Sequence, residues 1–113
     1  MEPIHSKKNQ RMARRLQAKT SAKVHATRNW LGLGSNIAIR ILDISESGIR
    51  LLLREPLEMG KEFEVTLEGP GSRPNRHLAQ VVWCVPLPDG SYVVGAKWEK
   101  YLPYPELLSL ARN

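Results

Sequence analysis

The sequence predicts an all-β protein, namely a six-stranded antiparallel small β-barrel with a basic N-terminal arm and a short C-terminal helix. After residue 20, apolar and polar residues alternate with a period of two in most segments, which is typical of half-buried strands. Turn-forming residues recur between these segments. With 113 residues and a hydrophobic fraction of 42%, the chain supports one small core, and closure of the barrel hides its edges.

Each element has its own signal. Ala22, Val24 and Ala26 alternate with polar residues in the first strand, and Ile37, Ile39 and Ile41 are expected to face the core in the second. Leucines after Pro105 predict a helix over residues 104–111, packed on the barrel. A Pro88-Asp89-Gly90 turn joins the last two strands. The strands are expected at residues 22–27, 37–42, 49–53, 62–68, 78–85 and 92–98.

The basic residues concentrate near the N-terminus. Residues 1–28 hold eight Lys or Arg and one acidic residue, a net charge of +7, whereas the remaining 85 residues hold nine basic and ten acidic residues. The whole chain has a net charge of +6 and a pI near 9.8. A uniformly basic surface would suit a polymer backbone, but this distribution indicates one local anion site. We divide the chain into a basic arm at residues 1–19 and a barrel with its helix at residues 20–113.

The composition indicates the cellular compartment in which the protein is expected. Cys84 is the single cysteine, so no intrachain disulfide forms, in keeping with a reducing compartment. The sequence has no apolar run of about 18 residues, and the N-terminus lacks the apolar stretch of a secretory signal. We expect a cytoplasmic protein without membrane insertion.

The residues for common catalytic chemistries are missing, so we expect no enzyme. His5, His25 and His77 are isolated in the sequence and predict no metal site. A Gly-x-Gly at residues 32–34 lacks the third glycine of a dinucleotide fold, and there is no Gly-Lys-Ser phosphate loop. Ser45 has no histidine in its segment to activate it as a nucleophile.

Two short motifs carry binding chemistry. Arg11 and Arg15 are four residues apart, so in a helix or tight turn both guanidiniums lie on one side. Asp43, Ser45 and Gly48 fall between two predicted strands. Guanidinium forks pair with phosphate or with the O6/N7 edge of guanine, and a carboxylate accepts from the ring N–H and amino group of guanine. The set therefore suits a guanine nucleotide with phosphates.

The smaller residues of the second motif have matching roles in this interpretation. Ser45 donates to a phosphate, and Gly48 takes a positive φ that lets the backbone approach the ligand. Two simpler interpretations stay open. The arginine pair is also compatible with a solvated basic surface, and Asp43 and Ser45 with an Asx-turn that bonds neighbouring amides.

The pairing of Arg-x-x-x-Arg with Asp-x-Ser-x-x-Gly, with 27 residues between them, resembles the PilZ domain of bacterial cyclic di-GMP receptors. The resemblance covers nearly the whole chain, because residues 79–85, the Pro88-Asp89-Gly90 turn and residues 92–96 also resemble the late strands of that barrel. It implies a PilZ-like barrel whose ligand is cyclic di-GMP and which needs no cofactor.

Carried onto this chain, the resemblance implies that Arg11 and Arg15 grip guanine and phosphate groups of cyclic di-GMP. Asp43 and Ser45 complete the site, and Gly48 shapes the turn that presents them. The arm is expected to reorganise across the barrel mouth when the ligand arrives. This reordering is the signal that a downstream protein partner reads.

Arg14 and Trp83 are auxiliary ligand-binding candidates. The indole of Trp83 offers a stacking surface for guanine, although its alternation with Val81 and Val85 favours a core position. The residue before Arg11 is Gln10, where family members with extra basic residues accept a stacked ligand dimer. One or two ligands per site therefore remain open.

Two other functions compete with this hypothesis. A small-barrel nucleic-acid-binding protein would contact phosphates through the arm, but Glu62, Glu64 and Glu68 would line a strand face that a polymer groove keeps positive. A PilZ-like protein-interaction module without ligand is the other alternative, and the intact arginine pair argues against it.

Overall fold

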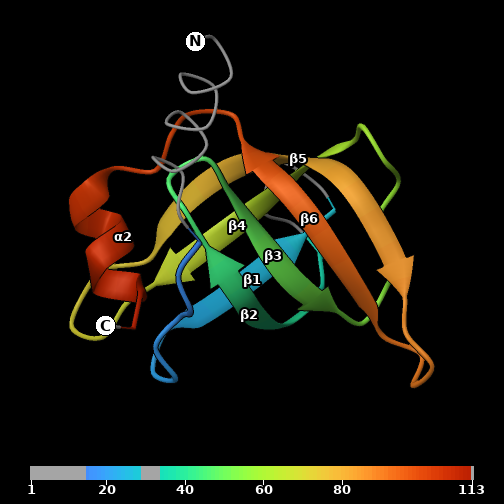
Figure 1. The fold of residues 1–113 in the computed structure, drawn as a ribbon, viewed down its shortest axis with the longest axis horizontal. Helices are drawn as coiled ribbons and strands as arrows, with labels where there is room; N and C mark the ends of the chain where they lie inside the picture. Colours follow the sequence, from blue (N-terminus) through green and yellow to red (C-terminus); the bar gives the residue numbers. More distant parts are fainter. Residues whose placement is uncertain (1–14, 29–33, 113) are drawn as a thin grey trace, which may run out of the picture.

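The computed structural model describes residues 15–28 and 34–112 and confirms the predicted fold. Within these residues, six antiparallel strands form a nearly closed barrel with one short helix near the C-terminus (Figure 1). The elements are β1 (Lys23–Thr27), β2 (Ala38–Ile44), β3 (Gly48–Leu53), β4 (Glu62–Glu68), β5 (Asn75–Pro86), β6 (Tyr92–Trp98) and α2 (Tyr104–Leu110).

The strands form one sheet in the order β1-β4-β5-β6-β3-β2, so the barrel closes where β1 approaches β2. We call this junction the seam. The side-chain oxygen of Asn36 accepts from the backbone N–H groups of Ala26 and Ala38, both at 2.9 Å, and Ile37 N–H donates to the Ala26 carbonyl at 2.9 Å. One amide side chain thus ties the first and last strands of the sheet together.

The chain segment before β1 also contributes to the barrel wall near the seam. Leu16 forms an antiparallel bridge with Ile44, with N–H···O distances of 2.7 and 2.8 Å, and Ala18 forms another with Ala111. This segment therefore meets the edge of β2 at Leu16 and the C-terminal end of the described chain at Ala18. The rest of the predicted arm, including Arg11 and Arg14, lies outside the described residues.

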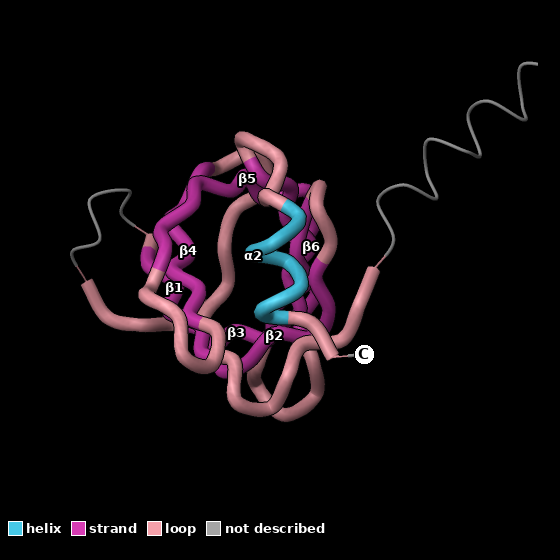
Figure 2. Tube along the Cα trace, turned by 90° about the vertical axis from the view of Figure 1, so that its left-hand side faces the viewer, coloured by secondary structure: helices cyan, strands magenta, loops and turns pink. Residues whose placement is uncertain are grey.

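The core fills the barrel, and α2 lies across one end of it (Figure 2). Leu102, Leu107 and Leu110 are buried there, and His77 on β5 pairs with Glu106 on α2 at 2.8 Å. Trp98 belongs to the core and is 4% exposed. The largest fully buried apolar side chains are Phe63, Ile44, Ile49, Leu51, Leu53, Leu67, Leu102, Leu110, Val65 and Val94.

Strict alternation fails in β2. Ile39, expected in the core, is 42% exposed, whereas its neighbour Ala38 is 3% exposed. The register of β2 against β3 shifts between Ala38 and Arg40, and an extra residue in one strand reverses the faces that follow it. The expectation for Ile39 was therefore wrong because the sequence does not reveal the irregularity.

The expected acidic face of β4 also differs. Glu64 is 7% exposed, and its carboxylate lies 3.7 Å from Arg76 on β5. Glu62 and Glu68 remain outside the core, as intermediate or exposed residues. The strand thus presents fewer free carboxylates than period two predicted.

Candidate functional site

The site is built on the β2–β3 hairpin. Asp43 near the end of β2 stands opposite Arg50 on β3 in the antiparallel register. Ile49 and Leu51, the neighbours of Arg50, are fully buried, so Arg50 points to the outer face of the barrel. Asp43 is only 7% exposed, which makes its carboxylate a shielded charge on that face.

Two guanidiniums hold this carboxylate, one on each oxygen. Arg15 Nη1 donates to Asp43 Oδ1 at 3.0 Å, and Arg50 donates to Oδ2 through Nε and also pairs with it through Nη2. The side chains of Arg15 and Arg50 are 52% and 42% exposed. Since a guanidinium has five N–H donors, both arginines keep donors that face solvent.

The ion pairs have an electrostatic consequence for Arg50. The hydrogen bond to Asp43 raises the pKa of Arg50 above its ordinary value, and the nearby negative charge acts in the same direction. The carboxylate thus keeps a fixed positive charge on the outer face. The sequence analysis missed Arg50. Its position two residues after Gly48, in a strand whose side chains alternate between two faces, indicated that it lies on the outer face.

Ser45 lies inside the hairpin turn. It is 1% exposed, and its Oγ accepts from the N–H groups of Ser47 and Gly48 at 3.3 and 3.2 Å. Its backbone carbonyl accepts from Trp98 Nε1 at 3.1 Å. These bonds shape the turn that follows Asp43 and anchor it to the core.

Gly48 does not adopt the expected positive φ, because the positive-φ glycines of the described chain are Gly34, Gly60, Gly71 and Gly90. A Cβ at Gly48 would instead lie 2.4 Å from the backbone oxygen of Ala96 on β6. Close approach of two backbones is a standard reason for glycine. The glycine of the motif therefore lets β3 pack against β6.

Trp83 does not join the core, contrary to what its alternation with Val81 predicted. The register of β5 against β6 shifts between Val81 and Trp83, and Trp83 is half-buried while Val81 is 2% exposed. The indole lies against Gly95 on β6, where a Cβ would be 2.3 Å from Trp83 Cε2. Gly95 leaves the space that the ring occupies.

One row of residues crosses the sheet, and we call it the outer row. It consists of Asp43, Arg50, Gly95 and Trp83. Asp43 pairs with Arg50, Arg50 with Gly95, and Gly95 with Trp83, and cross-strand partners share a face. With neighbouring strands about 4.8 Å apart, the backbones of Arg50 and Trp83 are separated by roughly 10 Å. The outer row thus has a cationic end at Arg50 and an aromatic end at Trp83.

Other site types find little support within residues 15–28 and 34–112. No group of three or more His, Cys, Asp or Glu residues there is arranged to hold a metal ion. None of the helices described is long and apolar enough to cross a membrane.

A family model described as the PilZ domain matches residues 9–106 of the chain. No curated protein and no solved structure gave a significant match. The family match spans the arginine motif, the hairpin that carries Asp43, and all six strands. This chain therefore belongs to the PilZ domain family, the bacterial receptor domains for cyclic di-GMP.

Proposed function

We propose that this protein is a cytoplasmic receptor that binds cyclic di-GMP on the outer row and relays the event to a protein partner. Arg11 and Arg15 grip the guanine and phosphate groups, with Arg14 as a possible addition. Asp43 with Ser45 and Gly48 forms the hairpin side of the site, and Arg50 joins it. The protein carries out no catalysis in this proposal.

One observation carries the proposal, namely the shielded carboxylate of Asp43 held between the two half-exposed guanidiniums of Arg15 and Arg50. The carboxylate orients both forks, so the entropy of ordering two long side chains is already lost before a ligand binds. Their free N–H donors then suit phosphate oxygens or the O6/N7 edge of guanine. Among the residues that the structure describes, Oδ1 accepts from Arg15 alone, and its second lone pair suits a guanine N–H.

Trp83 supplies the aromatic end of the same site. Its ring is held against Gly95 in the outer row, so stacking of a guanine on it requires no new ordering of the side chain. Stacking on an aromatic side chain contributes about 1–3 kcal/mol per base. A ligand with two guanines and two phosphates matches a row that offers both cations and an aromatic surface.

The relay follows from how residues 15–19 are attached. Leu16 bonds to Ile44 beside the hairpin, Lys19 N–H donates to the Leu110 carbonyl at 2.8 Å, and Arg112 N–H donates to the Gln17 carbonyl at 2.6 Å. A shift of Arg15 on ligand binding therefore reaches the end of α2. The outer side of that region exposes large apolar side chains, Tyr101, Tyr104 and Leu108, which suits a protein partner.

Calorimetric titration with cyclic di-GMP tests the proposal, with cyclic di-AMP and GTP at the same salt concentration. We expect saturable binding of cyclic di-GMP alone, with a dissociation constant in the low-micromolar range or below. Arg15→Ala removes a charge-assisted contact with the ligand, and Asp43→Ala removes the carboxylate that orients the arginines. Each variant should therefore weaken binding by about 10- to 100-fold. Circular dichroism should show that both variants stay folded.

Arg76→Gln is the matched control, because Arg76 also pairs with a buried carboxylate, that of Glu64, but on β5. Its affinity should stay within about twofold of the parent protein. Unchanged affinity in Asp43→Ala would overturn the site. Equal, salt-sensitive binding of all three nucleotides would favour the nucleic-acid alternative, and binding of none would favour the interaction module.

A further inference from the structure

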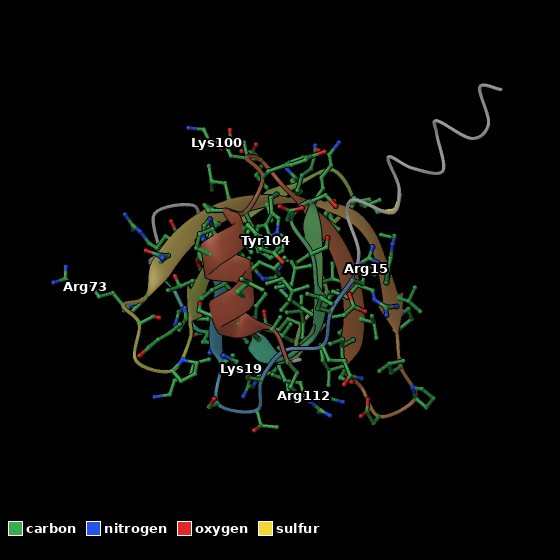
Figure 3. All side chains as sticks on the ribbon, turned by 60° about the vertical axis from the view of Figure 1, so that its left-hand side comes forward. Arg15, Lys19, Arg73, Lys100, Tyr104 and Arg112 are labelled. Atoms are coloured by element: carbon green, nitrogen blue, oxygen red, sulfur yellow. The ribbon has the colours of Figure 1, made fainter. Side chains whose placement is uncertain are left out.

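A cavity of about 340 Å³ lies between the chain segment before β1 and the free edge of β2. Residues 17–20 and Ala22 form one wall, residues 40–42 of β2 form the other, and Arg112 closes the end near the C-terminus. Figure 3 shows Lys19 and Arg112 close together below α2, and the bond from Arg112 N–H to Gln17 supports this placement. The cavity is separate from the outer row.

Among the described residues, three cations and no carboxylate line the cavity. Lys19, Arg40 and Arg112 line it, and the described residues place no acidic side chain in ion-pair contact with any of them. Two other cavities differ in this respect, because Glu62 and Glu99 line one and Glu99 the other, beside Lys or Arg. Of these three cavities in the described part of the chain, the first alone is lined by charges of one sign.

The three positive charges make this cavity attractive to an anion. Lys19 is half-buried, so it has lost part of its hydration, and the exposed Arg40 and Arg112 line the same space. Like charges around a partly enclosed cavity repel one another and raise the local positive potential. An anion that enters the cavity relieves this repulsion and gains charge-assisted hydrogen bonds from lysine and guanidinium donors.

The remaining lining suits a small organic anion with an apolar portion. Ala18, Ala22 and the buried Ile41 contribute apolar surface, and Gln17 and Thr20 add neutral polar groups. The volume falls at the lower end of the range for small-molecule sites. Guanidinium groups recognise phosphate through paired donors.

We propose that this cavity, the seam pocket, binds a phosphate-bearing small molecule through Lys19, Arg40 and Arg112. The proposal does not depend on cyclic di-GMP binding at the outer row. The phosphate comes from a free phosphorylated compound or from a lipid headgroup, and both sources share the same recognition chemistry.

Pyrophosphate is the probe for a free compound. Titration of the ¹⁵N-labelled full chain at constant ionic strength should shift the amides of Ala18, Thr20 and Leu42 saturably. The double variant Arg40→Gln/Arg112→Gln should weaken this binding by about tenfold or more. Arg73→Gln, an exposed arginine in the β4–β5 loop, should change it by less than about twofold.

Sedimentation with phosphatidylglycerol vesicles is the probe for a headgroup, with phosphatidylcholine vesicles as the neutral control. The seam pocket is supported if the protein binds either probe and the double variant loses that binding. The probe that binds then shows whether the phosphate belongs to a free compound or to a lipid headgroup. The proposal is overturned if neither probe binds, if the double variant binds as the parent does, or if shifts centre on Asp43 and Arg50.

Discussion

Ser45 and Gly48 of the Asp-x-Ser-x-x-Gly motif are engaged in the barrel itself. The Ser45 hydroxyl bonds the turn amides, and the Ser45 carbonyl bonds the core residue Trp98. Gly48 lets β3 lie against the Ala96 carbonyl. Asp43 alone among the three bonds to the side chains that face the proposed ligand. The motif therefore combines one residue that organises the cations with two that hold its hairpin.

Gly48→Ala tests the structural role of this glycine. The added Cβ meets a backbone oxygen at 2.4 Å, and backbone shifts of this kind cost about 1–3 kcal/mol of unfolding free energy. Urea denaturation should show this loss. Removing the Ala96 side chain in the same variant, Ala96→Gly, should not restore stability, since the contact is with the Ala96 carbonyl. Stability equal to that of the parent would show that β3 and β6 move apart freely.

Among the elements, the β5–β6 hairpin shows how a local sequence sets a turn. Gly90 has a φ of 91°, a conformation that glycine adopts without steric cost. Asp89 Oδ1 accepts from Ser91 N–H at 2.9 Å and from Ser91 Oγ at 2.6 Å. The Ser91 side chain, followed by its backbone N–H, lowers the pKa of Asp89 below its ordinary value.

This lowered pKa predicts a pH dependence. A carboxyl group whose folded pKa is depressed contributes stability above its unfolded pKa and loses it as the pH falls through the folded pKa. Ser91→Ala removes the largest cause, so the pKa of Asp89 should rise toward its ordinary value. Carboxyl-carbon NMR titration measures it directly, and an unchanged titration curve would show that Ser91 Oγ does not bond Asp89 in solution.

The element scale also explains the position of Trp83. The irregularity between Val81 and Trp83 in β5 turns the indole out of the core and places it against Gly95. Without it, period two would put Trp83 on the inner face together with Val81. One local change in strand register thus decides whether this tryptophan packs in the core or is available for stacking.

At the scale of the whole molecule, the barrel depends on closure at the seam. The sheet has β1 and β2 as its end strands, and the Asn36 side chain bonds the backbone of both sides. Closure brings residues 15–19 beside β2 and the C-terminal end. The outer row and the seam pocket both depend on this segment being in place.

Asn36→Ala tests closure. The Ala26 and Ala38 amides lose their acceptor, and leaving such groups unsatisfied costs about 1–3 kcal/mol. Thermal and urea denaturation should show this loss, whereas Asn75→Ala, an exposed asparagine at the start of β5, should be nearly neutral. Hydrogen exchange should rise most in β1 and β2. An equal effect of the two variants would contradict the role of Asn36.

The sequence by itself determined the all-β class, the six strands, the helix near the C-terminus and the family. The alternation of apolar and polar residues, the turn residues and the spaced motifs are local signals. Each reflects a local conformational or chemical preference of the chain. They also pointed to Asp43, because a carboxylate and a guanidinium pair have recognisable chemistry. Arg11 and Arg14 stay predictions, since they lie outside the described residues.

Only the tertiary structure decided which residues share a face and what surrounds them. The partnership of Asp43 with Arg50, the outward position of Trp83 and the burial of Glu64 follow from strand register and its irregularities. The close approach at Gly48 and the cations of the seam pocket come from chain segments far apart in the sequence. Such contacts arise when the sheet closes on itself. Local sequence patterns do not predict which distant segments that closure brings together.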